Sequence, residues 1–169
     1  MGDVAFFWTT RILSESNFSD RDKVAVIREL SQRVIRVGFG QMLDIGNSGK
    51  QQLLEDEVMM VHRYKTAEYT GALPLYVGAL LAGESDEKKL NSYQEYGTNL
   101  GWAFQIQDDI LGIFGEEEKT GKGVGTDLKE GRNTLFLIYL RKTGNKNGIE
   151  FVESLRDRKK ISERTLDEA

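Results

Sequence analysis

The sequence predicts an all-α protein, and three observations support that prediction. Apolar residues recur at helical spacing along most of the chain, and no stretch alternates polar and apolar residues as a half-buried strand does. Pro74 is the single proline among 169 residues. Because proline interrupts helices, such a chain can form long ones. The length suits about one domain, and 39% hydrophobic with 30% charged residues is ordinary for a globular chain.

Capping residues, glycines and apolar spacing divide the chain into successive helices. Gly71 and Pro74 are expected to distort the third of them near its end. Residues 115–134 are rich in glycine and form a loop, and residues 141–169 carry only a thin apolar stripe. The helices are expected, in chain order, over residues 3–15, 20–44, 51–70, 73–81, 86–114 and 134–140.

The most informative stretch is residues 98–114, TNLGWAFQIQDDILGIF, in which apolar residues go nearly all round a helix. Such a helix is expected to be largely buried. Asp108 and Asp109 lie too far inside it to act as caps, and burying two like charges is costly unless a cation neutralises them. Gln105 lies on the same helical face as Asp108. Alternatively, the pair faces solvent at a helix end produced by Gly112.

Composition limits the metal chemistry and the partners. The chain has no cysteine and a single histidine, His62, so only oxygen ligands can hold a metal, which suits magnesium. The acidic residues 55–57 complement a helix dipole and are interpreted as solvated. A net charge of −4 argues against nucleic acid as the main partner. No apolar run has membrane-spanning length, and the beginning of the chain lacks the basic region of a signal peptide. We expect a cytosolic protein.

The loop after Phe114 is suited to phosphate, because backbone N–H groups and basic side chains can both reach it. It is not a P-loop, since GxxxxGK[ST] and a preceding strand are absent from the pattern. Next to a carboxylate pair that binds magnesium, it predicts a diphosphate site. Gln41 and Asp44 share a helical face, and Lys65 lies one turn before Tyr69; a solvated surface explains both pairs equally well. The charged loop residues are Lys119, Lys122, Asp127, Lys129 and Arg132.

Five segments in order resemble the trans-prenyltransferases, the polyprenyl diphosphate synthases. The resemblance covers residues 2–140, and QDD followed by GKxxGxDLxEG is its most specific part. It implies an isoprenoid-synthase helical bundle around a central cavity, which usually forms a homodimer through the helix matching residues 3–15. The segments are Gly2-Asp3 before an aromatic helix, GQMLD at 40–44, KT at 65–66, FQIQDD at 104–109 and GKGVGTDLKEGRNT at 121–134.

The resemblance implies prenyl chain elongation. Magnesium assists the ionisation of an allylic diphosphate, and the carbocation then alkylates isopentenyl diphosphate. A leaving group with several negative charges needs electrostatic stabilisation in a dry cavity, which agrees with the residues present. The metal residues implied are Asp108, with Asp109 beside it, and Asp127, through water. The catalytic residues implied are Lys65, Thr66 and Gln105, of which Gln105 and the backbone of Thr66 would face the developing cation. Those implied to bind substrate or line the cavity are Lys65, Lys122, Arg132, Gln41, Asp44 and Tyr69.

The sequence also departs from the family pattern. Gly112 replaces the last aspartate of the second DDxxD motif, and Gly123 replaces the usual loop proline. The first DDxxD motif should lie before Gly2, and residues 1–64 contain no two adjacent aspartates. We therefore expect a partial domain that lacks N-terminal helices and the last C-terminal helices, is inactive alone and exposes core surface. A non-catalytic subunit of a heteromeric synthase, a class I terpene cyclase and a helical interaction domain are the alternatives.

Overall fold

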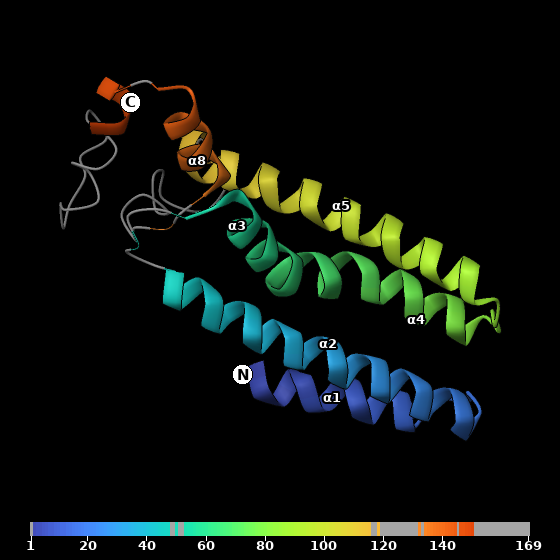
Figure 1. Ribbon diagram of the computed structural model, residues 1–169. Helices are drawn as coiled ribbons and strands as arrows, with labels where there is room; N and C mark the ends of the chain where they lie inside the picture. Colours follow the sequence, from blue (N-terminus) through green and yellow to red (C-terminus); the bar gives the residue numbers. More distant parts are fainter. Residues whose placement is uncertain are drawn as a thin grey trace.

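The computed structural model describes residues 2–47, 50, 53–115, 118, 132, 134–144 and 146–150. Within these ranges every regular element is helical, which confirms the all-α prediction. The elements are α1 (Gly2–Ser14), α2 (Asp20–Asn47), α3 (Glu55–His62), η1 (Arg63–Ala72), α4 (Leu73–Leu81), α5 (Glu87–Phe114) and α8 (Leu135–Lys142) (Figure 1).

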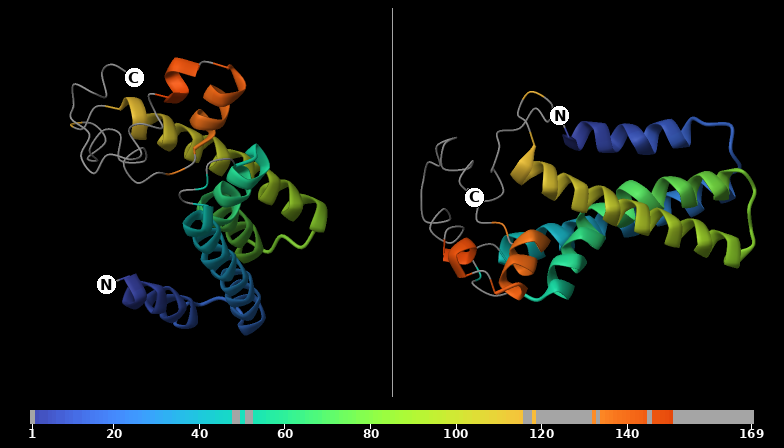
Figure 2. Two further views of the ribbon diagram at one scale, coloured as in Figure 1. Left: turned by 60° about the vertical axis from the view of Figure 1, so that its left-hand side comes forward. Right: turned by 90° about the horizontal axis from the view of Figure 1, so that it is seen from above.

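The helices are arranged around one central rod. α3, η1 and α4 follow one another without a break, and α2 and α5 lie along this rod on different sides (Figures 1 and 2). α1 runs back along α2 at the outer edge, and α8 contacts the ends of α3 and α5. Among the described residues, no helix combines the length and apolar character needed to cross a membrane. The rod therefore contacts both long helices, so side chains from the rod, α2 and α5 can meet at one site.

The middle of the rod is a π-helix, η1, of ten residues. The expected distortion near Gly71 and Pro74 is thus present, but it begins earlier, at Arg63. Pro74 lies in the first turn of α4, where its missing N–H leaves no helix bond unmade. π-helical turns are rare and occur mostly at functional sites. This one contains Lys65 and Thr66, both implicated by the sequence.

The prediction that residues 98–114 form a largely buried helix is wrong for most of the large apolar side chains, although Ile113 is buried. The buried positions of α5 include Gly97, Gly101, Asp109 and Ile113, which are spaced by four or eight residues and so lie along one face. The reason is close packing: a Cβ on Gly101 would lie 2.5 Å from the Cα of Ala67 on η1. Only small residues fit that contact, so the bulky ones turn outward. Those exposed on α5 are Tyr93, Tyr96, Leu100, Phe104, Ile110, Leu111 and Phe114.

Candidate active site

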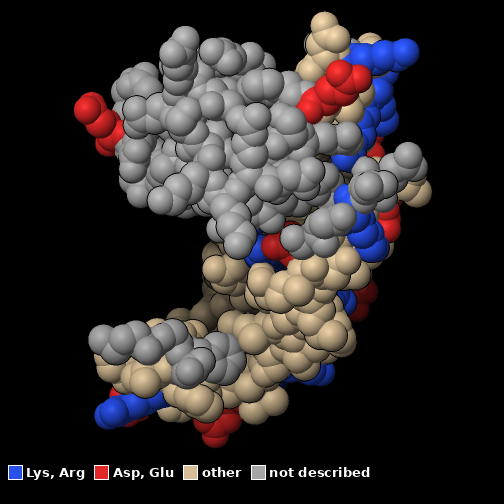
Figure 3. All heavy atoms as spheres, turned by 90° about the vertical axis from the view of Figure 1, so that its left-hand side faces the viewer, with Lys and Arg blue, Asp and Glu red and all other residues tan. Residues whose placement is uncertain are grey.

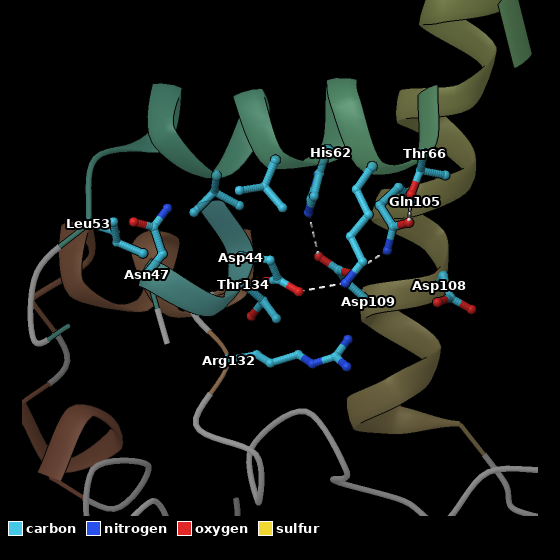
Figure 4. Close-up of a pocket in the computed structure, with 13 residues that line it drawn as sticks. Asp44, Asn47, Leu53, His62, Thr66, Gln105, Asp108, Asp109, Arg132 and Thr134 are labelled. Atoms are coloured by element: carbon cyan, nitrogen blue, oxygen red, sulfur yellow. Dashed lines mark hydrogen bonds and ion pairs between the residues drawn. The ribbon is translucent and has the colours of Figure 1, made fainter. Parts of the chain in front are cut away.

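A pocket of about 160 Å³ lies where α2, α3, η1 and α5 meet the segment before α8 (Figure 4). One part of its wall is apolar and comes from Leu53, Val58 and Val61. The remaining wall is polar, and its residues come from segments far apart in the sequence. Those that the sequence had implicated are Asp44, Lys65, Thr66, Gln105, Asp108, Asp109 and Arg132.

Gly40 brings α2 close to the π-helix. A Cβ at this position would lie 2.7 Å from the backbone nitrogen of Lys65, so a larger residue would push the helices apart. One turn later on α2, the Oδ2 atom of Asp44 is 2.5 Å from the Nζ atom of Lys65. Both side chains are partly buried. The sequence placed both residues in a substrate site, and the structure adds that they form an ion pair with each other at its wall.

A chain of polar contacts links α3, α5 and η1 inside the pocket. The Thr66 hydroxyl donates to Gln105 Oε1 at 2.6 Å, and Gln105 Nε2 donates to Asp109 Oδ1 at 2.9 Å. His62 Nε2 lies 3.1 Å from Asp109 Oδ2. Figure 4 shows these contacts at the pocket, between α5 on one side and the continuous helix formed by α3 and η1 on the other. Because each contact joins a different pair of elements or turns, the chain ties the rod to α5.

The two adjacent aspartates occupy different environments. Consecutive helical residues point about 100° apart, and the structure places Asp109 against His62 while Asp108 is less buried and lines the pocket. The alternative of a solvated pair at a helix end is wrong, because α5 continues through Gly112 to Phe114 and Asp109 is only 9% exposed. Asp109 accepts from Gln105 and lies against His62. Because Asp108 is the less buried of the two, it is the carboxylate better placed to meet a ligand.

The remaining predicted residues divide into three groups. Arg132 extends into the pocket from the segment before α8 (Figure 4). Gln41 and Tyr69 do not line this pocket, and Tyr69 is 47% exposed. The expectation that they line a substrate cavity stays a prediction. Lys122 and Asp127 fall outside the described residues.

Three polar pocket residues had no assigned role in the sequence analysis: His62, Asn47 and Thr134. The sequence analysis mentioned His62 only to conclude that a single histidine cannot form a histidine metal cluster. Its position three residues before Lys65, on the same helical side, was the available signal. No comparable signal marked Asn47 or Thr134. Both are more than nine-tenths buried, and their side chains reach the pocket only because α2 and the start of α8 converge there.

A second charged cluster lies on η1 away from the pocket. Glu68 is 1% exposed and accepts from Arg36 at 2.8 Å and from Arg63 at 2.7 Å, with Arg33 at 3.3 Å. Burial raises the pKa of Glu68, but the hydrogen bonds from Arg36 and Arg63 and the charge of Arg33 outweigh it, so the pKa lies below its ordinary value. Glu68 thereby anchors the π-helix to α2. The sequence analysis did not find this cluster.

The family model described as Polyprenyl synthetase matches residues 1–169. The chain belongs to the polyprenyl synthetase family. Among curated polyprenyl synthetases, farnesyl diphosphate synthase of Escherichia coli (strain K12) is 32% identical over 172 residues, which cover 98% of this chain and 57% of that protein. Geranylgeranyl diphosphate synthase of Cyanophora paradoxa is 40% identical, over 66% of this chain and 37% of that protein.

The solved structures agree with this assignment. Geranylgeranyl pyrophosphate synthase from Corynebacterium glutamicum, crystallised with isoprenyl diphosphate and magnesium, matches with a TM-score of 0.87 and 30% identity. The match covers 98% of this chain and 47% of that one. The predicted isoprenoid-synthase fold is therefore confirmed, and the chain spans about half the length of the polyprenyl synthetases that it matches.

The pocket residues fit a magnesium ion as a polyprenyl synthetase would need it. Magnesium usually keeps several waters and is bound through one or two carboxylates together with substrate phosphates. Asp108 lines the pocket with a carboxylate, and Lys65 and Arg132 add positive charge to the same lining. The described residues contain no group of three or more His, Asp or Glu side chains that could enclose a metal by themselves. The donor set therefore suits a metal held jointly with a diphosphate.

Proposed function

We propose that this chain forms one wall of a prenyl diphosphate synthase site, which condenses an allylic diphosphate with isopentenyl diphosphate. The observation that carries this proposal is the convergence of Lys65, Arg132 and Asp108 on one pocket beside the Thr66–Gln105 pair. The two basic side chains, together with a metal on the carboxylate, suit the negatively charged diphosphate that leaves. The neutral oxygen atoms of Thr66 and Gln105 suit the carbocation that remains. Membership in the polyprenyl synthetase family supports the same function, as does the match of nearly the whole chain to a farnesyl diphosphate synthase.

Each pocket residue then has a role in the reaction. Lys65 and Arg132 bind the diphosphate oxygens, and Asp44 holds the Lys65 ammonium group at the pocket wall. Asp108 would hold magnesium, which supplies Lewis-acid stabilisation of the departing diphosphate. The C–O bond breaks, the electron pair leaves with the diphosphate, and the allylic cation remains near Gln105. Oxygen atoms fixed in place there stabilise positive charge without reorganising.

The carbon–carbon bond then forms when the double bond of isopentenyl diphosphate attacks the allylic cation, and loss of a proton restores a double bond. The Thr66 hydroxyl and the Gln105 amide remain bonded to each other beside this step. Lys122 and Asp127 keep the roles that the resemblance implies, a phosphate ligand and a carboxylate near the metal.

We further propose that residues 1–169 give no prenyl product on their own. Among the described carboxylates that line the pocket, Asp44 pairs with Lys65 and Asp109 lies against His62, and we assign magnesium to Asp108 alone. A diphosphate leaving group calls for more cationic charge than one such site can hold. Large apolar side chains on α2 and α5 are exposed, among them Phe39 and Phe104. A homodimer through α1 is part of the same proposal, because Phe7 is 70% and Trp8 is 60% exposed there.

Calorimetric titration with inorganic diphosphate tests the site directly. We expect binding that strengthens when magnesium is present, and at least a tenfold loss of affinity in Lys65→Ala and in Asp108→Asn. Lys88→Ala is the matched control, because Lys88 is exposed in the first turn of α5, far from the pocket. Equal affinity in Lys65→Ala and Lys88→Ala would contradict the proposed site. Prenyl product from residues 1–169 with magnesium and both substrates would contradict the proposed inactivity.

A further inference from the structure

We propose that His62 is a positioning residue that fixes, through Asp109, which atoms of Gln105 and Thr66 face the pocket. This inference rests on the proposed function, because it concerns the groups beside the developing cation. His62 itself is assigned no contact with substrate. Its role would be exerted through one carboxylate and one amide.

The contacts form a continuous path between three elements. His62 is the last residue of α3 and is 6% exposed, and its Nε2 atom reaches α5 at Asp109 Oδ2, 3.1 Å away. The other oxygen, Oδ1, accepts from Gln105 Nε2 one turn earlier on α5, at 2.9 Å. Gln105 Oε1 in turn accepts from the Thr66 hydroxyl on η1, at 2.6 Å. Figure 4 shows all four side chains at the pocket.

The carboxylate sets the direction of every hydrogen bond in this path. An ionised carboxylate only accepts, so Gln105 must turn its nitrogen toward Asp109 and its oxygen toward Thr66. The Thr66 hydroxyl has one proton, and it donates that proton to Gln105. The atoms left beside the pocket are therefore oxygen lone pairs of Thr66 and Gln105. A Gln105 amide rotated by half a turn would place N–H donors there, which repel a cation.

His62 is needed because an aspartate side chain held at one oxygen can rotate. His62 Nε2 lies at an ion-pair distance of 3.1 Å from Oδ2, and the Gln105 N–H is bonded to Oδ1, so each oxygen has a nitrogen atom beside it that restricts rotation of the carboxylate. Without His62, Asp109 can turn toward the pocket and release the Gln105 amide. Neither His62 Nδ1 nor Asp109 Oδ2 has a hydrogen-bond partner among the described residues, so the close approach of these two buried side chains is the contact that carries the inference.

The test is the nuclear magnetic resonance signal of the Gln105 side-chain NH₂ group in the full chain, assigned by its loss in Gln105→Leu. We expect this pair to exchange slowly with solvent in the unaltered protein. His62→Phe keeps a buried ring without the N–H, and we expect exchange at least tenfold faster and a signal position close to that of exposed glutamines. His62→Gln can place an N–H near the former Nε2 position, so it should restore slow exchange. Asp109→Asn should resemble His62→Phe.

A purely structural role for His62 would change the melting temperature without changing the Gln105 signal. An unchanged Gln105 signal in folded His62→Phe would overturn the inference. If His62→Phe does not fold, His62→Asn, whose amide is too short to reach Asp109, is compared with His62→Gln, and identical Gln105 signals in those two would overturn it equally. The proposed function fails separately. In that case the unaltered chain binds no diphosphate, while the dependence of Gln105 on His62 persists.

Discussion

The interface between η1 and α5 and the interface between α1 and α2 pair helices in opposite ways. Where η1 meets α5, Ala67 and Ala72 are fully buried, and Gly97 and Gly101 allow backbone to approach backbone. Close approach leaves little freedom to slide or rotate. It therefore fixes the register of the two elements, and the hydrogen bonds between Thr66, Gln105 and Asp109 depend on that register.

Within the described part of the chain, the interface between α1 and α2 lacks this close approach of backbones, and the outward surface of α1 carries exposed apolar side chains. Among the α1 side chains that the structure describes, Leu13 is the buried apolar one, whereas Phe7, Trp8 and Ile12 are at least 60% exposed. Figure 3 shows the end of the molecule at which α1 begins, with a hollowed surface beside α1 that is mostly neither acidic nor basic. The comparison teaches that tight packing of small residues builds the site, whereas the large apolar side chains of α1 face outward.

Replacing a glycine of the tight interface should have the largest effect. In Gly97→Ala the new Cβ would lie 2.6 Å from the Cα of Ala72 and from the backbone oxygen of Gly71. Backbone atoms cannot yield as a flexible side chain does, so we expect a loss of about 3 kcal/mol in the free energy of unfolding, measured by urea denaturation. Gly78→Ala on α4 is the control, since nothing lies within 4 Å of its Cβ. It should gain up to about 1 kcal/mol, and equal stability of the two variants would refute the role of close packing.

Removing the Glu68 carboxylate should have the next largest effect, because it separates η1 from α2. Glu68→Gln leaves Arg33 buried without its countercharge, while Arg36 and Arg63 are nearly half exposed and can be hydrated. We expect a loss of about 2 kcal/mol, below the usual range for a fully buried pair. Glu15→Gln breaks the exposed ion pair with Arg11 and should cost less than about 0.5 kcal/mol. A Glu68→Gln variant as stable as Glu15→Gln would show that the cluster does not anchor the π-helix.

The same carboxylate predicts how stability depends on pH. The pKa of Glu68 is lower in the folded protein than in the unfolded chain, so the unfolded chain takes up its proton first as the pH falls. Its stabilising contribution is complete well above the ordinary glutamate pKa of about 4.3 and is lost as the pH falls through the folded value. The stability difference between the unaltered protein and Glu68→Gln should therefore shrink from pH 7 to pH 3.5. Denaturation curves at several pH values measure it, and a constant difference would exclude this contribution.

The exposed face of α1 should give the smallest change in stability. We expect Trp8→Ser to alter the free energy of unfolding by no more than about 0.5 kcal/mol, because Trp8 is 60% exposed. If α1 mediates the proposed homodimer, the same change should weaken association, measured by sedimentation velocity over a range of concentrations. Ser14→Ala, at the exposed end of α1, is the control. A large loss of stability, or association that Trp8→Ser does not affect, would contradict this role.

The helices were predictable because their signals are local. Ser19 accepts from the backbone N–H of Asp22 at the start of α2, and Asp86 accepts from that of Lys88 at the start of α5, as capping residues do. The end of the fourth helix near Gly83 is also where the structure places it, and φ is +87° there. The exact extent of the π-helix was not predictable, since it results from packing against α2 and α5 on two sides.

The candidate site was predictable in its residues more than in their relations. Motif spacing identified Lys65, Thr66, Gln105 and the aspartate pair, and the pocket brings them together. The distinction between Asp108 and Asp109 was not visible, because it depends on where His62 lies in space. The ion pair of Lys65 with Asp44 joins residues 21 positions apart and needs the close approach at Gly40.

By itself the sequence determined the helical class, the approximate helix boundaries, the family and the set of residues that could bind a metal and a diphosphate. Those properties depend on composition, periodicity and the order of short motifs, all of which are read along one dimension. Only the tertiary structure decided which face of α5 is buried, which aspartate is held by protein donors and which helix surfaces remain exposed. Those depend on how closely backbones approach at Gly97 and Gly101, and that distance is set by the packing of separate helices against one another.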